Sequence, residues 1–211
     1  MMSNKTKIKN IIFDFGGVLS VLDINISRQR FIELGVTNID DYLDITAQKG
    51  FFGQLEDGSL SADEFCRRLS ELTHRKLTLE QCAHAWRGFI VDIPKRGLVG
   101  LRQLRAQGYH LSLLSNTNPF VGSLMHDANF DGEQHPLTSY FDAAYLSYEQ
   151  HLMKPDLRFF KRVLDEQHYA PAQTLLVDDS PVNCAAAQQL GINTYQPANG
   201  ENWPALIARH L

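Results

Sequence analysis

Short apolar runs that end abruptly in polar residues recur along the chain. They occupy residues 11–13, 109–114, 143–146, 174–177 and 192–195. Each of them is followed at once by a polar residue, and Asp14, Ser115 and Asp178 stand at three of these ends. An apolar run of this length, bounded by turn residues, predicts a buried strand. We therefore expect five strands, each ending at a polar side chain.

The long stretch between the first two predicted strands has a helical pattern instead. It shows no alternation of strand type, and it contains two start signals of helices. Ser61 precedes Glu64 by three residues and Thr78 precedes Gln81 by three, which is the spacing of a capping box. We therefore expect this stretch to be an all-helical insert.

The order of the remaining elements predicts the fold class. After the insert, helical stretches alternate with the apolar runs, which is the arrangement of a doubly wound parallel sheet. We predict an α/β protein whose Rossmann-like core comprises residues 1–20 and 94–211, with a small helical cap at residues 21–93. The cap follows the first strand directly, so it is well placed to cover the end of that strand.

Composition narrows the range of partners. The 211 residues carry a formal net charge of -4 without a basic run, which argues against nucleic acid and anionic membranes. No apolar segment approaches the roughly 20 residues that span a bilayer, and residues 1–10 lack the apolar core of a signal peptide. We therefore expect a cytoplasmic protein, either a monomer or a homodimer. Cys66, Cys82 and Cys184 are too few and too widely spaced to indicate a disulfide framework or a zinc site.

The polar strand ends are expected to meet. Parallel strands of an open α/β sheet bind ligands at their carboxyl ends, so we expect Asp14, Ser115, Lys154 and the pair Asp178 and Asp179 to meet on one edge. Lys154 precedes Pro155, which keeps it extended at a junction of loop and helix. The adjacent carboxylates of Asp178 and Asp179 repel each other unless a cation or a basic group lies between them. A solvated aspartate at a strand end and a catalytic one both remain open for Asp14 taken alone.

Four motifs in this order resemble those of the haloacid dehalogenase-like (HAD) hydrolases. They are Phe-Asp-Phe-Gly-Gly-Val-Leu, Leu-Ser-Asn-Thr-Asn, Lys-Pro-Asp and Val-Asp-Asp-Ser. The likeness covers nearly the whole chain. The residues of these motifs are similar to those of one branch of the family. This branch includes the bacterial alpha-glucose-1-phosphate phosphatase and the amino-terminal phosphatase domain of soluble epoxide hydrolase.

The resemblance implies a magnesium-dependent phosphatase that hydrolyses a small phosphomonoester such as a sugar phosphate. Asp14 would be the nucleophile and would form an aspartyl-phosphate, a known covalent strategy for carboxylates. Asp14, the carbonyl of Gly16 and Asp179 would hold Mg²⁺, because this ion prefers hard oxygen ligands. The expected partner is a small phosphorylated metabolite.

Further roles follow from the same resemblance. The Ser115 hydroxyl and the Asn116 amide would hold the transferred phosphoryl oxygens. Lys154 would offset the gathered negative charge. Asp178 would pair with Lys154 or support the metal ligands, and Asn183 would assist it.

One position departs from the family pattern. Most phosphatases of this superfamily carry an acid/base aspartate two residues after the nucleophile, where this chain has Gly16. Loss of a general acid/base typically costs about 10²–10⁴-fold in rate. Asp23, a short way along the chain, is a candidate replacement. Gln54 and Trp86 are candidate substrate contacts from the cap, although aromatic residues at helical spacing, such as Trp86, are more often core residues.

Two other functions remain open. In a dehalogenase the same Asp14 would attack carbon without a metal, but the paired carboxylates Asp178 and Asp179 would then serve little purpose. In a phosphate-binding regulatory protein the site would persist with weak or no turnover, because Gly16 replaces the usual acid/base.

Overall fold

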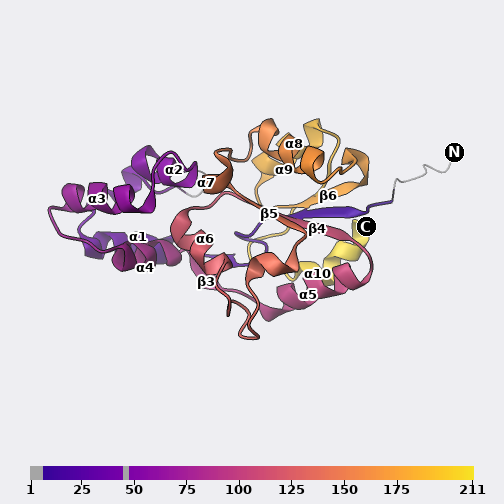
Figure 1. The fold of residues 1–211 in the computed structure, drawn as a ribbon, viewed down its shortest axis with the longest axis horizontal. Coiled ribbons are helices and arrows are strands. Elements are labelled where there is room, and N and C mark those ends of the chain that lie inside the picture. Colours follow the sequence, from indigo (N-terminus) through magenta and orange to yellow (C-terminus); the bar gives the residue numbers. More distant parts are fainter. Residues whose placement is uncertain (1–6, 45–47) are drawn as a thin grey trace.

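A parallel five-stranded sheet forms the centre of the protein, and the predicted α/β doubly wound class is confirmed (Figure 1). The computed structural model describes residues 7–44 and 48–211. The sheet order is β5-β4-β1-β6-β7, and each neighbouring pair is parallel. The strands are β1 (Asn10–Phe13), β4 (His110–Ser115), β5 (Ala143–Leu146), β6 (Thr174–Val177) and β7 (Asn193–Tyr195).

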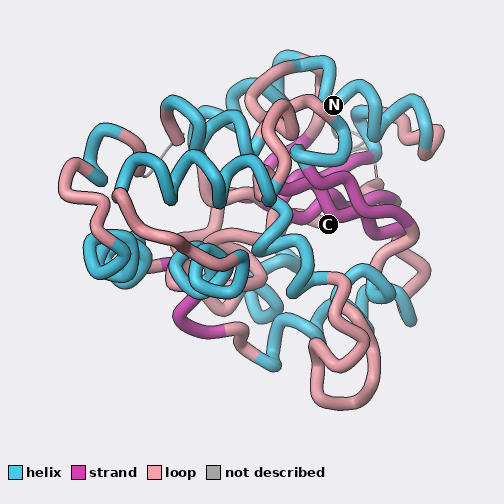
Figure 2. The backbone as a smooth tube through the Cα atoms, turned by 60° about the vertical axis from the view of Figure 1, so that its left-hand side comes forward, coloured by secondary structure: helices cyan, strands magenta, loops and turns pink. Residues whose placement is uncertain are grey.

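Helices cover both faces of this sheet, as Figures 1 and 2 show. α5 (Lys95–Ala106) and α10 (Trp203–Leu206) pack on one face, and α8 (Leu157–Glu166) and α9 (Pro181–Gln189) pack on the other. Side chains of β1 alternate between the two cores: Phe13 joins the α5 side and Ile12 the α8 side. The central strand is therefore buried on both faces.

Shorter elements complete the core. They are α6 (Pro119–Met125), α7 (Ser147–Gln150), and the 3₁₀ helices η2 (Leu137–Tyr140), η3 (Pro171–Gln173) and η4 (Ile207–Arg209). Cys66, Cys82 and Cys184 are free and buried. Within the described ranges, none of the helices has the length and apolar character needed to cross a membrane.

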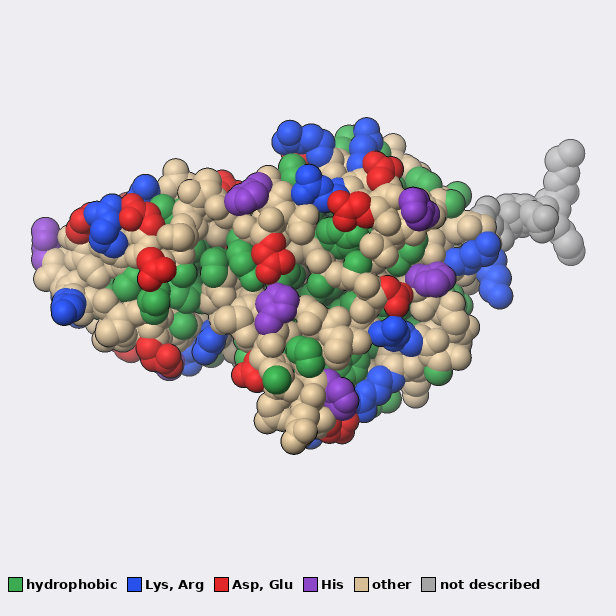
Figure 3. All heavy atoms as spheres, viewed as in Figure 1, with side chains coloured by type: hydrophobic (Ala, Val, Ile, Leu, Met, Phe, Trp, Pro, Cys, Tyr) green, Lys and Arg blue, Asp and Glu red, His purple; other side chains and the backbone are tan. Residues whose placement is uncertain are grey.

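A second group of helices lies beyond the carboxyl edge of the sheet, and it forms the left-hand part of the molecule in Figure 1 and in the space-filling view of Figure 3. It contains α1 (Ile24–Leu34), η1 (Ile39–Asp41), α2 (Gly50–Glu56), α3 (Ala62–Thr73) and α4 (Leu79–Arg87). The antiparallel pair β2 (Val21–Leu22) and β3 (Ile90–Asp92) joins these helices to the core. Both strands lie within residues 21–93, for which the sequence predicted only helices, so that prediction was wrong at the two ends of the insert. We call residues 21–92 the cap.

The cap helices start where the sequence placed them. Thr78 accepts a hydrogen bond from the Gln81 amide nitrogen, and the Gln81 side chain accepts one from Thr78 N, which completes a capping box. Ser61 accepts from the Glu64 amide nitrogen in the same way. The Glu64 carboxylate accepts instead from arginines on the next turn of its own helix. Capping therefore sets the start of both helices.

The cap has its own aromatic core. Phe31, Phe52 and Trp86 are almost fully buried, and their ring centroids lie 5.0 to 5.6 Å apart. Phe120 of α6, a core helix, packs into the same cluster, with its ring 5.9 Å from that of Phe65. Aromatic pairs at such separations stabilise each other beyond the burial of their area. The cap is therefore docked on the core through α6.

Replacing Phe52 by alanine tests how strongly this cluster stabilises the protein. Phe52 contacts rings on several sides, so the change leaves a cavity and should lower the free energy of unfolding by about 3–5 kcal/mol. Urea denaturation measures the loss. Leu72→Ala, at a position that is 37% exposed, is the control and should cost far less. Equal losses in the two variants would contradict the central place of Phe52.

Candidate active site

Three polar side chains meet at the carboxyl edge of the sheet, and strand register explains why. β1 lies between β4 and β6, and Phe13 is level with Leu113 on one side and Val177 on the other. Asp14 and Asp178 are therefore neighbours directly beyond the strand ends, with Ser115 beside them on β4. The amide nitrogen of Asp14 donates to the carbonyl of Val177 at 2.9 Å, which extends the strand pairing up to the site.

Lys154 lies buried between the two aspartates. Its Nζ is 3.0 Å from Asp14 Oδ2 and 2.7 Å from Asp178 Oδ2, and its side chain is 1% exposed. Asn116 positions the lysine: its amide group donates to the Lys154 carbonyl and accepts from the Lys154 amide nitrogen, both at 2.8 Å. The loop after β4 therefore holds the cation in place for the strands on either side.

Asp178 has donors at both carboxylate oxygens. The backbone nitrogen of Ser180 donates to Oδ1 at 2.9 Å, and the Asn183 amide reaches Oδ1 at 3.0 Å and Oδ2 at 3.2 Å. Asn183 lies on the first turn of α9, which Ser180 caps. Asp178 is thus fully occupied, and this arrangement fits the supporting position that the sequence indicated.

The carboxylates of Asp14, Asp178 and Asp179 form a compact cluster of oxygen donors. One oxygen from each lies within 4.8 Å of the others. Gly17 makes room for this cluster, because a Cβ at Gly17 would lie only 2.1 Å from Asp179 Oδ2. Gly17 also has a φ of +70°, which favours glycine. Hard oxygen donors with this spacing fit Mg²⁺.

The charges of this cluster are unfavourable without a cation. Burial raises the pKa of Asp14 to about 7, against the effect of Lys154, and the neighbouring Asp178 and Asp179 add to the rise. Burial and Asp178 also raise the pKa of Asp179. Burial alone would lower the pKa of Lys154, but the two carboxylates beside it outweigh burial and raise it. A divalent cation would favour the ionised carboxylates.

A second cluster with metal-ligand residue types consists of Asp131, Glu133 and His135. The Asp131 carboxylate there accepts from the Tyr140 hydroxyl at 2.6 Å and from the backbone nitrogens of Glu133 and His135. These bonds hold its own loop together. The cluster at the sheet edge is therefore the better candidate for a metal.

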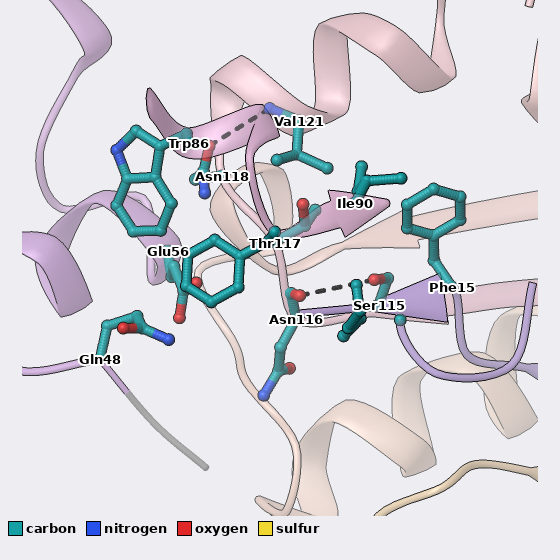
Figure 4. A pocket seen from close by; sticks show the side chains of 13 residues that line it. Phe15, Gln48, Glu56, Trp86, Ile90, Ser115, Asn116, Thr117, Asn118 and Val121 are labelled. Atoms are coloured by element: carbon teal, nitrogen blue, oxygen red, sulfur yellow. Dashed lines mark hydrogen bonds between the residues drawn. The ribbon is translucent and has the colours of Figure 1, made fainter. Parts of the chain in front are cut away.

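A pocket opens between the sheet edge and the cap, and Figure 4 shows its lining. The core contributes Gly16, Ser115 and Asn116, while the cap contributes Trp86 and two polar side chains, those of Gln48 and Glu56. The structure thus brings the sequence candidate Trp86 into the lining. The pocket adjoins the loop that carries Asp14, so a ligand bound at the carboxylates would extend toward the cap.

Two other sequence candidates are not brought into this lining. Gln54 lies on the exposed side of α2, where Arg68 Nη1 donates to its side-chain oxygen at 3.0 Å. Asp23 caps α1 and accepts from the Asn25 amide nitrogen at 2.9 Å. Its neighbour Leu22 lines the pocket instead.

Sequence reasoning missed Gln48 and Glu56. The signal available for Glu56 was the Glu-Asp-Gly turn that ends α2. A Cβ at Gly58 would lie 2.1 Å from the Tyr148 carbonyl oxygen, so this turn packs tightly against α7 of the core. No pattern in the sequence pointed to Gln48.

The fold and the site are typical of a class of hydrolases. In this class a sheet edge rich in carboxylates lies under a helical cap. A model of the haloacid dehalogenase-like hydrolase family matches residues 8–191, and the chain belongs to this family. It is 44% identical over 196 residues to the D-ribitol-5-phosphate phosphatase of Bacteroides thetaiotaomicron. The match covers 93% of this chain and 95% of the relative.

Solved structures of relatives share the fold over almost their whole length. A predicted HAD-like family hydrolase from Porphyromonas gingivalis is 39% identical with a TM-score of 0.91, and the match covers 96% of this chain and 97% of that one. A HAD-family enzyme from Bacteroides thetaiotaomicron, in complex with magnesium and inorganic phosphate, is 37% identical with a TM-score of 0.86. That match covers 94% of this chain and 98% of the other.

Removing the buried cation should be costly. In Lys154→Met the carboxylates of Asp14 and Asp178 would face each other without a compensating charge, so we expect the free energy of unfolding to fall by about 3–5 kcal/mol in chemical denaturation. Lys161→Met removes an exposed lysine of α8 and is the control. Equal stability of the two variants would show that Lys154 does not balance the site.

Gly17→Ala tests whether Mg²⁺ binding depends on the position of the Asp179 carboxylate. The new Cβ would displace the Asp179 carboxylate, so Mg²⁺ affinity measured by calorimetry should fall at least about tenfold. Gly132→Ala is a matched control: its φ of +76° carries a similar backbone strain, but nothing lies within 4 Å of the new Cβ. Unchanged affinity in Gly17→Ala would remove Asp179 from the metal site.

Proposed function

We propose that this protein is a magnesium-dependent phosphatase that hydrolyses a small phosphomonoester, a sugar or sugar-alcohol phosphate, through an aspartyl-phosphate at Asp14. The observation that carries the proposal is the buried Lys154 between Asp14 and Asp178, beside a three-carboxylate cluster at the mouth of a capped pocket. The 44% identity to a D-ribitol-5-phosphate phosphatase supports the substrate class.

Asp14 is held in a fixed orientation for attack. Its Oδ1 accepts from the Phe15 amide nitrogen at 2.7 Å, while Oδ2 lies beside Lys154 Nζ. A carboxylate oxygen of Asp14 bonds to phosphorus as the bond to the leaving alkoxide breaks, and the alkoxide takes up a proton from water in the pocket. A water molecule then attacks the phosphorus of the aspartyl-phosphate, which releases inorganic phosphate, restores the Asp14 carboxylate and returns a proton to the solvent.

The surrounding residues act on the transferred group. Ser115 and Asn116 line the pocket beside Asp14 and bind the phosphoryl oxygens, and Lys154 balances their charge. Asp14, the carbonyl of Gly16 and Asp179 hold Mg²⁺, which supplies positive charge to the phosphoryl group when bound. Asp178 and Asn183 support this set through Lys154.

The wider biological setting is part of the proposal. The residues of the four motifs support membership of the branch that includes alpha-glucose-1-phosphate phosphatase and the amino-terminal domain of soluble epoxide hydrolase. We infer a cytoplasmic enzyme, monomeric or homodimeric, whose partner is a small phosphorylated metabolite. Asp23 stays a candidate acid/base. To act, its carboxylate would have to give up the hydrogen bond with which it caps the start of helix α1.

The test is phosphate release from pentitol, hexitol, aldose and triose phosphates with Mg²⁺. We expect turnover with the polyol or sugar phosphates, its loss on chelation, and a fall of at least about 10³-fold in Asp14→Asn, because the nucleophile is removed. Asp63→Asn, an exposed carboxylate of the cap, is the control. Activity that survives chelation and loss of Asp14, or release of a single phosphate per chain, would overturn the proposal; the second result would indicate a regulatory phosphate binder.

A further inference from the structure

One carboxyl group in the pocket belongs to none of the interactions described so far. Glu56 ends α2 and lines the pocket on the cap side, across from Ser115 and Asn116 (Figure 4). Among the described residues its side chain forms no hydrogen bond and no ion pair. The side chain is only partly buried and lines the pocket, so its carboxyl is available to a bound molecule. This position points to a contact with a ligand.

The backbone of Glu56 is fixed relative to the catalytic edge. Ser147, the fully buried first residue of α7, donates through its hydroxyl to the Glu56 carbonyl at 2.6 Å. The same hydroxyl accepts from the amide nitrogen of Thr117 at 2.8 Å, two residues after Ser115. The Ser147 side chain thus connects Glu56 to the loop after β4. This connection fixes the position of Glu56 relative to the end of the pocket where the phosphoryl group would bind.

The chemistry of Glu56 suits a hydroxyl group. Burial, and to a lesser degree the charge of Asp57, raises the pKa of Glu56 to about 8. The carboxyl is therefore mostly neutral at pH 7, when it can both donate and accept a hydrogen bond. A neutral group also avoids repulsion of a phosphate dianion in the same pocket. Gln48 also lines the pocket on this side, but its side-chain oxygen accepts from the Asp44 amide nitrogen at 3.2 Å and its nitrogen donates to the Asp44 carbonyl at 3.0 Å, so among the described residues Glu56, and not Gln48, is left without a partner there.

We propose that Glu56 is a specificity-determining residue, whose carboxyl binds a hydroxyl group on the carbon chain of the substrate. This inference rests on the proposed phosphatase function and refines its substrate class. Substrates are then phosphates of polyhydroxylated chains, with a hydroxyl beyond the carbon that bears the phosphate. Phosphates of apolar alcohols are rejected, because they leave the Glu56 carboxyl unpaired.

The experiment compares a pentitol phosphate with 1-pentyl phosphate, which has the same chain length without hydroxyls. Glu56→Met removes the polar group at similar volume. We expect kcat/KM for the pentitol phosphate to fall about 10- to 100-fold, chiefly through KM, while that for 1-pentyl phosphate stays level or rises. Glu56→Gln should restore most of the loss, because an amide still donates and accepts. Glu80→Met, at an exposed position of α4, is the control.

The pH profile gives a second readout that does not need Glu56→Met to fold. Below pH 8 the wild-type carboxyl is neutral; above it the group ionises, loses its donor and repels the phosphate. KM for the pentitol phosphate should therefore rise above about pH 8 in the wild type and stay flat over that range in Glu56→Gln. The melting temperature of Glu56→Gln should match or exceed that of the wild type, since no internal partner is lost.

Several outcomes would overturn the inference. They are equal losses with the two substrates, a fall in kcat at constant KM that glutamine does not restore, the same pH limb in Glu56→Gln, or a lowered melting temperature in that variant. The kcat result would assign Glu56 to proton transfer instead. Failure of the proposed function looks different, because the wild type would then release no phosphate from any substrate, p-nitrophenyl phosphate included.

Discussion

The balance of charge around the Lys154 ammonium is the constraint on which the site depends. Asp14 and Asp178 come within hydrogen-bonding distance of the same nitrogen in a place where little water can reach them. Two carboxylates so close together would otherwise not both ionise. The strand register that makes them neighbours is tolerable only because Asn116, on a third strand's loop, holds the lysine at that point. Apolar packing stabilises the sheet, whereas the balance of charge determines which residues are tolerated directly after its strands.

The sequence predicted which side chains of the core meet at the sheet edge, for a physical reason. Strands of a parallel sheet all end at one edge, so Asp14, Ser115 and Asp178 had to meet once the strands were recognised. Lys154 follows no strand; Pro155 placed it at a junction of loop and helix on the same edge, and only the family resemblance indicated its role as a counter-charge. Local chemistry also set the helix starts, as at Thr78, whose capping box needs nothing from the tertiary structure.

On the cap side of the site, the sequence indicated Trp86, which lines the pocket, but it also indicated Gln54 of α2, which does not. Residues 54 and 56 of α2 are two positions apart, about 200° around the helix, so they lie on opposite sides of it. With seven residues, α2 is too short for its apolar pattern to show which side faces the core. Docking against α7 turns Glu56 inward and leaves Gln54 outside with Arg68. Pairing with β2 likewise makes residues 90–92 a strand, which no local pattern requires.

Phe120 has a consequence for how far the cap can move away from the core. Its ring belongs to a core helix but is buried in the cap cluster, and Arg87 of the cap donates to its carbonyl at 3.1 Å. Any swing of the whole cap away from the sheet must bring this ring into water, at a cost of about 1.5–3 kcal/mol. That alone keeps the fraction of fully opened molecules near one in ten to one in a hundred. Full separation of the cap from the core is therefore a rare state, and residues at this joint control its frequency without lining the pocket.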